Sequence, residues 1–542
     1  MPDQNLQDIK DYAVFIRFNR IVSAGGKLSP KAESALEELK RKHPDFLGDA
    51  GERADFDMWS SSGFRGPRGD PTKLRDTKTE NLIEEALALV AQSQWEQGDL
   101  WSIICRDEPA RAFDAIEADA LRGRWIPEAW RPFLESVAAS DDPSVLARAL
   151  TLAKDAPDEL LKECIYFFSS WLSRQGKKAF EKVELRRNAF ELWDRVAAIV
   201  YAQPPLDVLE RDDKSDLFTS ALNEPGGTLA NVLLELLSAA KPKVDAGMPV
   251  DIRERATLAA SSDGRSGLLA RMIFASRLAY IDSIDHEWAA ANMFRRLSWS
   301  EPDARHLWGA RAYDGRPGMP RMFNALKADF LETFQRPDRS HDERQALVAQ
   351  LLRALMWKDG ESHPPYEIES YEVRRAFATA PSTTRQTAAW LFMNWLRAKD
   401  EGGVKGETPD VRWRGLIGKT FREVWPLDAK LRDPETSHRL IWLPLSCDTE
   451  FGDAVDFVVN LIVPMRLFQI SVAFEFEKAG KILLQKYPRP FLRLLNAAID
   501  PLLYRVPEDL GEVLEQIEVA EPASVDDDAF RRLTGAWKLR QA

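Results

Sequence analysis

Cysteine and histidine are scarce in this sequence, with three cysteines and six histidines in 542 residues. Cys105, Cys164 and Cys447 lie far apart, which favours reduced thiols in the cytoplasm over a disulfide framework. The histidines are equally dispersed, and no two have the four-residue spacing with which one face of a helix presents two ligands to a metal ion. The sequence therefore predicts neither disulfides nor a metal site.

Long apolar runs are also missing. No stretch approaches the roughly 20 apolar residues that a membrane-spanning helix requires. The first residues, MPDQNLQDIKDYAV, lack the basic and then apolar pattern of a secretory leader. We expect a cytoplasmic protein that has no membrane partner.

The signatures of common cofactor and hydrolase sites are absent as well. The sequence contains no GxxxxGK[ST] loop, no HExxH pair, no paired CxxC and no GxSxG turn. The formal charge of -12 argues against a general binder of phosphate backbones, which needs a dense cationic face. We therefore expect no cofactor and no catalytic residues of a familiar type.

Apolar and aromatic residues are plentiful, at 44% and 10% of the chain. They recur with helical periodicity, most readably in residues 413–465, where Trp413, Phe421 and Val424 would share one helix face. Pro426 predicts the end of that helix, because proline disfavours a helical residue before it and donates no hydrogen bond. No stretch shows sustained period-two alternation, so little β structure is expected.

Prolines and short polar residues indicate where other helices begin. Prolines at typical first-helical positions are Pro109, Pro143, Pro157 and Pro507. Pro507 is expected to open the last helix of the chain. Asp448 or Thr449 is expected to cap the helix that follows them, and Asp285 to cap the helix that carries Trp288.

The succession of short helices and tight breaks predicts an all-α fold with an extended helical-repeat-like architecture, either a solenoid or several bundles. No fixed repeat period is visible. We expect four regions: N-terminal helices and a loop in 1–80, a Trp-rich helical region in 81–245, a central helical domain in 250–400 and a C-terminal helical domain in 405–542. The Gly/Pro-rich segment 314–320 is interpreted as a connection between helices. Tryptophans expected to be wedges between helices rather than a ligand cage are Trp95, Trp101, Trp125, Trp130, Trp171 and Trp193.

One cluster of titratable residues is a candidate for catalysis. One helical turn and its flanking loops could bring Asp433, Glu435, His438 and Asp448 together, and a histidine beside carboxylates titrates in a useful range for general acid–base chemistry. The favoured interpretation is structural: carboxylates stabilise the N-terminus of a helix, and His438 follows one turn later.

Four phrases of the sequence resemble a known family. They are LLARMIFASRLAYIDSIDHEWAAANMFRRLSW, ARHLWGARAYDGRPGMPRMFNALKADFLETF, FREVWPLDAKLRDPETSHRL and YPRPFLRLLNAAIDPLLYRVPEDLGEVLEQI. They are similar to the C-terminal helical domain of unknown function in long bacterial Sir2-family anti-phage proteins, the defence-associated sirtuins. The likeness covers about 260–525 and, more loosely, 80–245. Its anchors are Trp288, Trp299, Trp308, Lys327, Trp425, Pro426 and Asp500.

The enzyme of that family is an N-terminal Sir2 domain that binds NAD, and nothing in this chain matches it. The resemblance therefore implies the non-catalytic part: a helical scaffold or sensor of a bacterial anti-phage defence system. Its partner would be a protein, either a separately encoded effector or a phage protein. Two alternatives stay open: a nucleic-acid-binding component with a basic groove, and an enzyme, nuclease or NAD-consuming, with a noncanonical site around His438.

Overall fold

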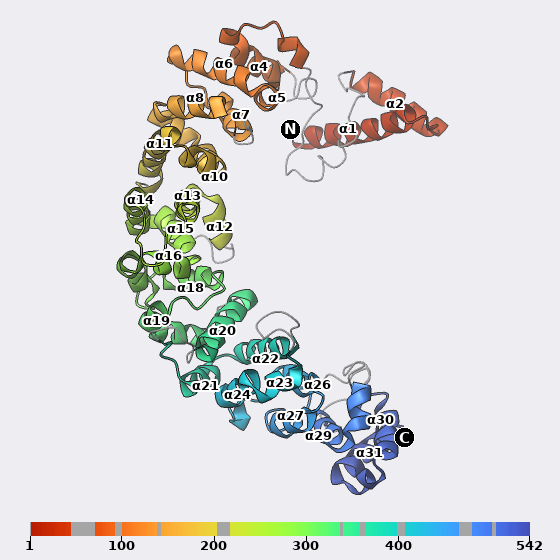
Figure 1. Cartoon of the computed structure of the whole chain (residues 1–542). Helices are drawn as coiled ribbons and strands as arrows, with labels where there is room; N and C mark the ends of the chain where they lie inside the picture. The colour runs from red at the N-terminus through yellow and green to blue at the C-terminus, as the bar shows by residue number, and fades with distance from the viewer. Residues whose placement is uncertain are drawn as a thin grey trace. The chain divides into compact units, whose positions relative to one another are not determined.

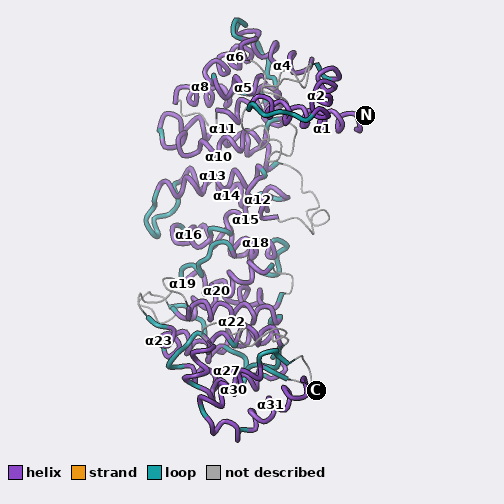
Figure 2. Tube along the Cα trace, turned by 90° about the vertical axis from the view of Figure 1, so that its right-hand side faces the viewer, coloured by secondary structure: helices purple, strands orange, loops and turns teal. Residues whose placement is uncertain are grey.

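The chain is helical throughout the part that can be described. The computed structural model describes residues 2–44, 71–92, 100–137, 143–202, 217–336, 340–357, 365–397, 407–465, 480–500 and 506–541. Within these ranges the chain forms helices joined by loops and contains no β-strand (Figures 1 and 2). The prediction of an all-α fold is confirmed.

The helices group into two compact units. Unit 1 comprises residues 1–213, 220–241 and 262–270, and unit 2 comprises residues 214–219, 242–261 and 271–542. Because the units interleave between 214 and 270, the boundary at 245 is not a single cut, and the finer division into four regions stays a prediction. None of the described helices is long and apolar enough to cross a membrane.

Unit 1 contains the elements up to α13 and shares α12 (Leu217–Asn223) and α15 (Gly264–Ala275) with unit 2. Its own elements are α1 (Pro2–Ser23), α2 (Pro30–Lys42), η1 (Pro71–Leu74), η2 (Thr79–Asn81), α4 (Leu82–Gln92), α5 (Leu100–Asp107), α6 (Pro109–Leu121), α7 (Pro127–Val137), α8 (Pro143–Lys154), α9 (Asp158–Glu163), α10 (Ile165–Glu181), α11 (Val183–Tyr201) and α13 (Pro225–Ala240).

Unit 2 continues with shorter helices and several single turns. Its elements are α14 (Val250–Ser261), α16 (Leu278–Ile284), α17 (His286–Ala289), η3 (Ala290–Phe294), η4 (Arg295–Leu297), α18 (Ala304–Ala312), α19 (Pro320–Glu332), η5 (Thr333–Gln335), α20 (His341–Met356), α21 (Ser370–Thr379), α22 (Ser382–Arg397), α23 (Pro409–Arg414), α24 (Leu416–Val424), η6 (Ala429–Leu431), α25 (Pro434–Leu440), α26 (Trp442–Leu445), α27 (Phe451–Val458), α29 (Pro488–Ala498), α30 (Leu510–Ala520), η7 (Pro522–Asp526) and α31 (Asp528–Gln541).

Several helix boundaries follow from local chemistry as expected. Pro109 and Pro143 are the first residues of α6 and α8. Helix α24 ends at Val424, directly before Trp425 and Pro426. The Asp285 side chain accepts a hydrogen bond from the backbone N–H of Trp288 and so caps α17.

Other boundaries differ from the expectation. Pro157 lies one residue outside α9, at its N-cap. Neither Asp448 nor Thr449 caps α27, which has Glu450 at its N-cap; the backbone N–H groups of Asp448 and Glu450 instead donate to Asp410 Oδ1 at 2.9 and 2.8 Å. Pro507 does not open the last helix, because α30 begins at Leu510 and α31 follows it.

Each helix packs on elements that are near it in the chain. In unit 1, α8 packs on α11 and α10 on α13; in unit 2, α20 packs on α22 and α22 on α25. Side-chain hydrogen bonds repeat this spacing, since Arg195 bonds Lys154, 41 residues earlier, and Gln350 bonds Arg311, 39 residues earlier. Contacts of this range are typical of helical repeats, in which each pair of helices rests on the next. The helical-repeat-like architecture is confirmed within each unit.

Arginine side chains close the C-terminal ends of neighbouring helices. The last carbonyls of a helix have no partner within it, and a cation near them also interacts favourably with the helix dipole. Arg385 Nη1, on α22, donates to the carbonyls of Phe377 and Ala380 at the end of α21, both at 3.0 Å. Further examples are Arg195 to Lys154 O, Arg271 to Ala260 O, Arg412 to Trp395 O, Arg374 to Glu423 O and Arg532 to Ile499 O.

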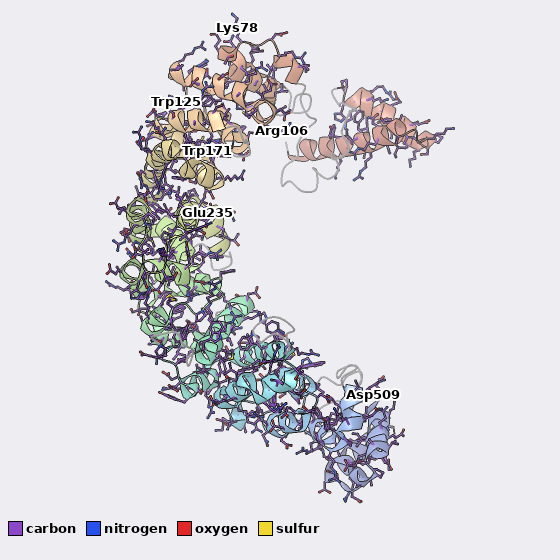
Figure 3. The ribbon with its side chains drawn as sticks, viewed as in Figure 1. Lys78, Arg106, Trp125, Trp171, Glu235 and Asp509 are labelled. Atoms are coloured by element: carbon purple, nitrogen blue, oxygen red, sulfur yellow. The ribbon has the colours of Figure 1, made fainter. Side chains whose placement is uncertain are left out.

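Tryptophans fill the spaces between helices of unit 1. Trp101, Trp130, Trp171 and Trp193 are almost completely buried (Trp171 is labelled in Figure 3). The half-buried Trp125 stacks on Trp130 with ring centroids 5.8 Å apart. These tryptophans are wedges, as predicted, whereas Trp95 lies outside the described residues.

Two buried tryptophans of unit 1 permit a matched test of the hydrogen bonds between helices. Trp101 Nε1 donates to Ala129 O at 2.8 Å, while Trp171 Nε1 is buried without a hydrogen-bond partner. Trp101→Phe removes a buried hydrogen bond between two helices, whereas Trp171→Phe removes none, so we expect Trp101→Phe to lower the free energy of unfolding by about 0.5–1.5 kcal/mol more than Trp171→Phe does. Urea unfolding followed by circular dichroism at 222 nm measures both, and equal losses would contradict the assignment.

Candidate functional site

The predicted cluster around His438 is built on the start of α25. Asp433 is the N-cap: its Oδ1 accepts from the backbone N–H of Thr436 at 2.7 Å, and its Oδ2 accepts from Thr436 Oγ1 at 2.6 Å. Glu435 is exposed in the first turn. Both carboxylates thus lie where they stabilise a helix N-terminus.

The other two members of the cluster have different surroundings. His438 is half-buried, and burial, with a smaller contribution from Arg439, lowers the pKa of its imidazole. The imidazole is therefore neutral at pH 7, the state in which it could accept a proton. Asp448 is exposed beyond α26, and its Oδ1 pairs with Lys486 Nζ at 2.6 Å. The structure thus engages Asp448 with the segment before α29, and a general acid–base role for the cluster stays a prediction.

Metal ligands do not gather in the part of the chain that the structure describes. No group of three or more His, Cys, Asp or Glu side chains there is arranged to hold a metal ion. Cys105, Cys164 and Cys447 are buried cysteines outside any disulfide, and burial raises the pKa of Cys164 to about 11.

The segment that follows α18 is a stronger candidate for a functional site. From the sequence alone this segment is interpreted only as a connection between helices. We call residues 313–319 the pinned loop. The chain turns at Gly315 and Gly318, whose φ angles are +69° and +91°. The positive φ at Gly318 favours glycine, because other residues rarely adopt this conformation. The atom nearest to a Cβ placed there, Met322 Cε at 2.0 Å, is the end of a flexible side chain.

The pinned loop is held from beneath by a buried ion pair. Arg311, only 2% exposed, donates from Nη2 to Arg316 O at 2.6 Å, and its Nη1 lies 3.3 Å from Asp314 Oδ2. Asp314 Oδ2 also accepts from the backbone N–H of Ala279 at 2.8 Å. Burial lowers the pKa of Arg311 and raises the pKa of Asp314, and each charge partly opposes the effect of burial on the other.

Two further side chains hold the loop from its flanks. Arg353 Nη1, on α20, donates to Gly315 O at 2.8 Å, and the Tyr366 hydroxyl donates to Gly318 O at 2.6 Å. The loop is therefore held at the side chain of Asp314 and at the backbone carbonyls of residues 315, 316 and 318 by groups from four other parts of unit 2.

The ion pair continues into a network with α16. Asp282 is completely buried, its Oδ1 lies 2.6 Å from His286 Nδ1, and its backbone carbonyl accepts from Arg321 Nη2 at 2.7 Å. Asp282 also favours the charged form of Arg311. Removing an ion from water costs several kcal/mol, which the partner charge offsets only when the geometry is good. Such a network contributes little net stability, and we interpret it as a device that fixes one loop conformation.

The outer side of the pinned loop is exposed. Tyr313 is 54% exposed, and its ring stacks on Phe218 of α12 with centroids 4.1 Å apart and planes 12° from parallel. Arg316 and Met319 are exposed as well. Tyrosine, arginine and methionine are enriched in binding surfaces. The sequence signal that could have identified this site is the pattern Arg-Ala-Tyr-Asp-Gly at residues 311–315. In it an arginine and an aspartate three residues apart lie on either side of a tyrosine, and a glycine follows.

Breaking the buried pair tests its role. Asp314→Asn leaves the Arg311 charge buried without its carboxylate, so we expect a loss of about 3–5 kcal/mol in the free energy of unfolding. The double variant Arg311→Met/Asp314→Asn removes both charges and should recover most of that loss, which urea unfolding measures. A double variant that is as unstable as Asp314→Asn alone would show that the charges do not act as a pair.

The His438 environment predicts a pH dependence of stability. The pKa of folded His438 lies below the unperturbed value of 6.5, so the unfolded chain binds a proton more readily. The free energy of unfolding should fall as the pH falls below 6.5 toward the lowered pKa. The decrease in the free energy of unfolding that His438 causes should be absent in His438→Gln. It should be unchanged in a control, His341→Gln, at an exposed imidazole of α20. Identical pH profiles for His438→Gln and the unaltered chain would contradict it.

Comparison with known proteins gives a distant relative whose own function is not characterised. An "Uncharacterized protein y4cA" of Sinorhizobium fredii (strain NBRC 101917 / NGR234) is 24% identical over 543 residues. The match covers 97% of this chain and 43% of that protein, so the chain spans less than half the length of this relative. No family model matches the chain, and no solved structure matches it.

Proposed function

We propose that this protein is a helical scaffold or sensor of a bacterial anti-phage defence system that acts by binding a protein partner. The observation that carries the proposal is the way in which neighbouring helices are joined. Buried tryptophans and arginines fix each helix on elements near it in the chain, and this arrangement leaves loops and helix faces along each unit accessible. Helical-repeat proteins use such surfaces to bind other macromolecules.

Two further points support this function. The sequence resemblance is to the helical part of defence proteins whose enzyme is a separate domain. The relative y4cA combines a region similar to nearly all of this chain with additional sequence, as expected where a helical module works together with another domain. The proposed partner is a separately encoded effector or a phage protein.

Plating of phage and purification of the complex test the proposal together. Deleting the gene from the bacterium that encodes it should raise the plating efficiency of at least one phage, and expressing the full chain should reverse the change. The tagged chain should then co-purify with an effector from a neighbouring gene, or with a phage protein, as a stoichiometric complex in mass photometry. The same chain from a strain that lacks the neighbouring gene is the control. Unchanged plating together with a monomer that binds neither class of protein would overturn the proposal.

A further inference from the structure

The outer face of α1 is both apolar and basic. The inner face packs on α2 through a small core of buried side chains: Tyr12, Phe15, Ile16 and Leu36. The outer face carries Lys10, Val14, Arg17 and Ile21 at steps of three and four residues. All four are exposed, Val14 at 38% and Ile21 at 43%. Such steps align side chains along one side of a helix, so these four residues form one stripe, the α1 stripe.

A stripe of opposite charge runs along α30. The inner face of α30 is buried at Leu510, Val513, Leu514 and Ile517. The outer face carries Glu512, Glu515 and Val519, again at steps of three and four residues. All three are exposed, Val519 at 84%. No lysine, arginine or histidine occurs between residues 506 and 530. We call these three residues the α30 stripe.

The charges of both stripes are left without ion pairs. In the part of the chain that the structure describes, Lys10, Arg17 and Glu515 have no oppositely charged partner, whereas Arg489 pairs with Glu521, directly after α30, at 2.7 Å. An exposed apolar residue beside unpaired charges of one sign fits a face of the opposite sign. Opposite charges steer such an association, and like charges exclude the wrong partner.

The two stripes match each other in charge and in spacing. Arg17 and Ile21 are four residues apart on α1, as Glu515 and Val519 are on α30. If the two helices lie side by side in the same direction, a contact between Ile21 and Val519 therefore places Arg17 beside Glu515. We propose that the α1 stripe of one copy of this chain docks on the α30 stripe of a second copy.

This contact joins two different faces, so it is heterologous and can repeat from copy to copy. A two-fold dimer through either stripe alone would bring like charges together, which disfavours it. Self-association goes beyond the proposed scaffold function, and it would let several copies present their binding surfaces together. It is tested on the purified chain without a partner protein, so the two proposals can fail separately.

Sedimentation velocity of the purified full chain measures the association. At 0.1 M salt the average mass should rise with protein concentration from that of one chain, 61.5 kDa, to species larger than a dimer. At 1 M salt the screening length falls from about 10 Å to about 3 Å, and the average mass should return toward that of one chain. Val519→Ala removes two methyl groups from the contact and should weaken association about tenfold. Leu121→Ala, at an exposed leucine of α6, is the matched control and should associate normally.

Charge reversal identifies the two faces. Lys10→Glu/Arg17→Glu and, separately, Glu512→Lys/Glu515→Lys should each leave the chain monomeric, because like charges then meet. An equimolar mixture of the two variants should associate again, since opposite charges meet between one variant and the other. Arg375→Glu, at an exposed arginine of α21, is the control and should associate like the unaltered chain.

Three results would overturn this contact. One is a chain with normal circular dichroism that stays monomeric at every concentration at which it is soluble. Another is association that survives either charge reversal, or that the mixture of the two variants fails to restore, because oppositely charged stripes would then not be the faces that meet. The third is loss of a protein partner in Lys10→Glu/Arg17→Glu without any self-association of the unaltered chain, which would assign the α1 stripe to that partner.

Discussion

The unsatisfied carbonyl groups at helix ends are the constraint on which this structure depends. A chain of many short helices has many such ends, and every buried carbonyl without a partner costs free energy. In this protein arginines from neighbouring helices supply the missing donors, as Arg385 does for α21 and Arg412 for α22. Arginine suits this task because its planar group carries five donors on a long side chain. The same bonds that complete one helix therefore fix its position on the next.

The arginine contacts also explain why the fold is held together locally. Helix α11 reaches back to the end of α8 through Arg195, and α31 reaches back to the end of α29 through Arg532. Each bond spans a short distance in the chain, so every helix pair is stabilised by its neighbours. Single loops and helix faces of such a fold are available for recognition.

Much of the fold could be predicted from sequence because its signals are local. Pro426 removes a donor at a defined position, and α24 ends where the proline requires. The failures have non-local causes. The side chain of Asp448 does not cap α27 because it pairs with Lys486, 38 residues later. Side-chain hydrogen bonds between residues 28 to 49 apart recur along the chain. The sequence hides this recurrence, because the bonds are of the Trp–carbonyl, Arg–carbonyl or Arg–carboxylate kind by turns and no one motif repeats.

The pinned loop illustrates the same limit at the candidate site. Its glycines and proline are visible in the sequence and predict a turn, but the turn alone leaves the loop free to move. Its conformation is fixed by the buried Arg311 and Asp314, which α20 contacts through Gln350 and α16 through Ala279. The buried pair carries a desolvation cost that an apolar pair of similar volume would avoid, and the network around Asp282 extends that cost. The connection from α18 to α19 does not require a buried ion pair, because an ordinary turn would suffice. The desolvation cost of the pair is understandable if the position of Tyr313 matters for function. The loop is therefore a better candidate for recognition than the solvent-facing carboxylates of α25.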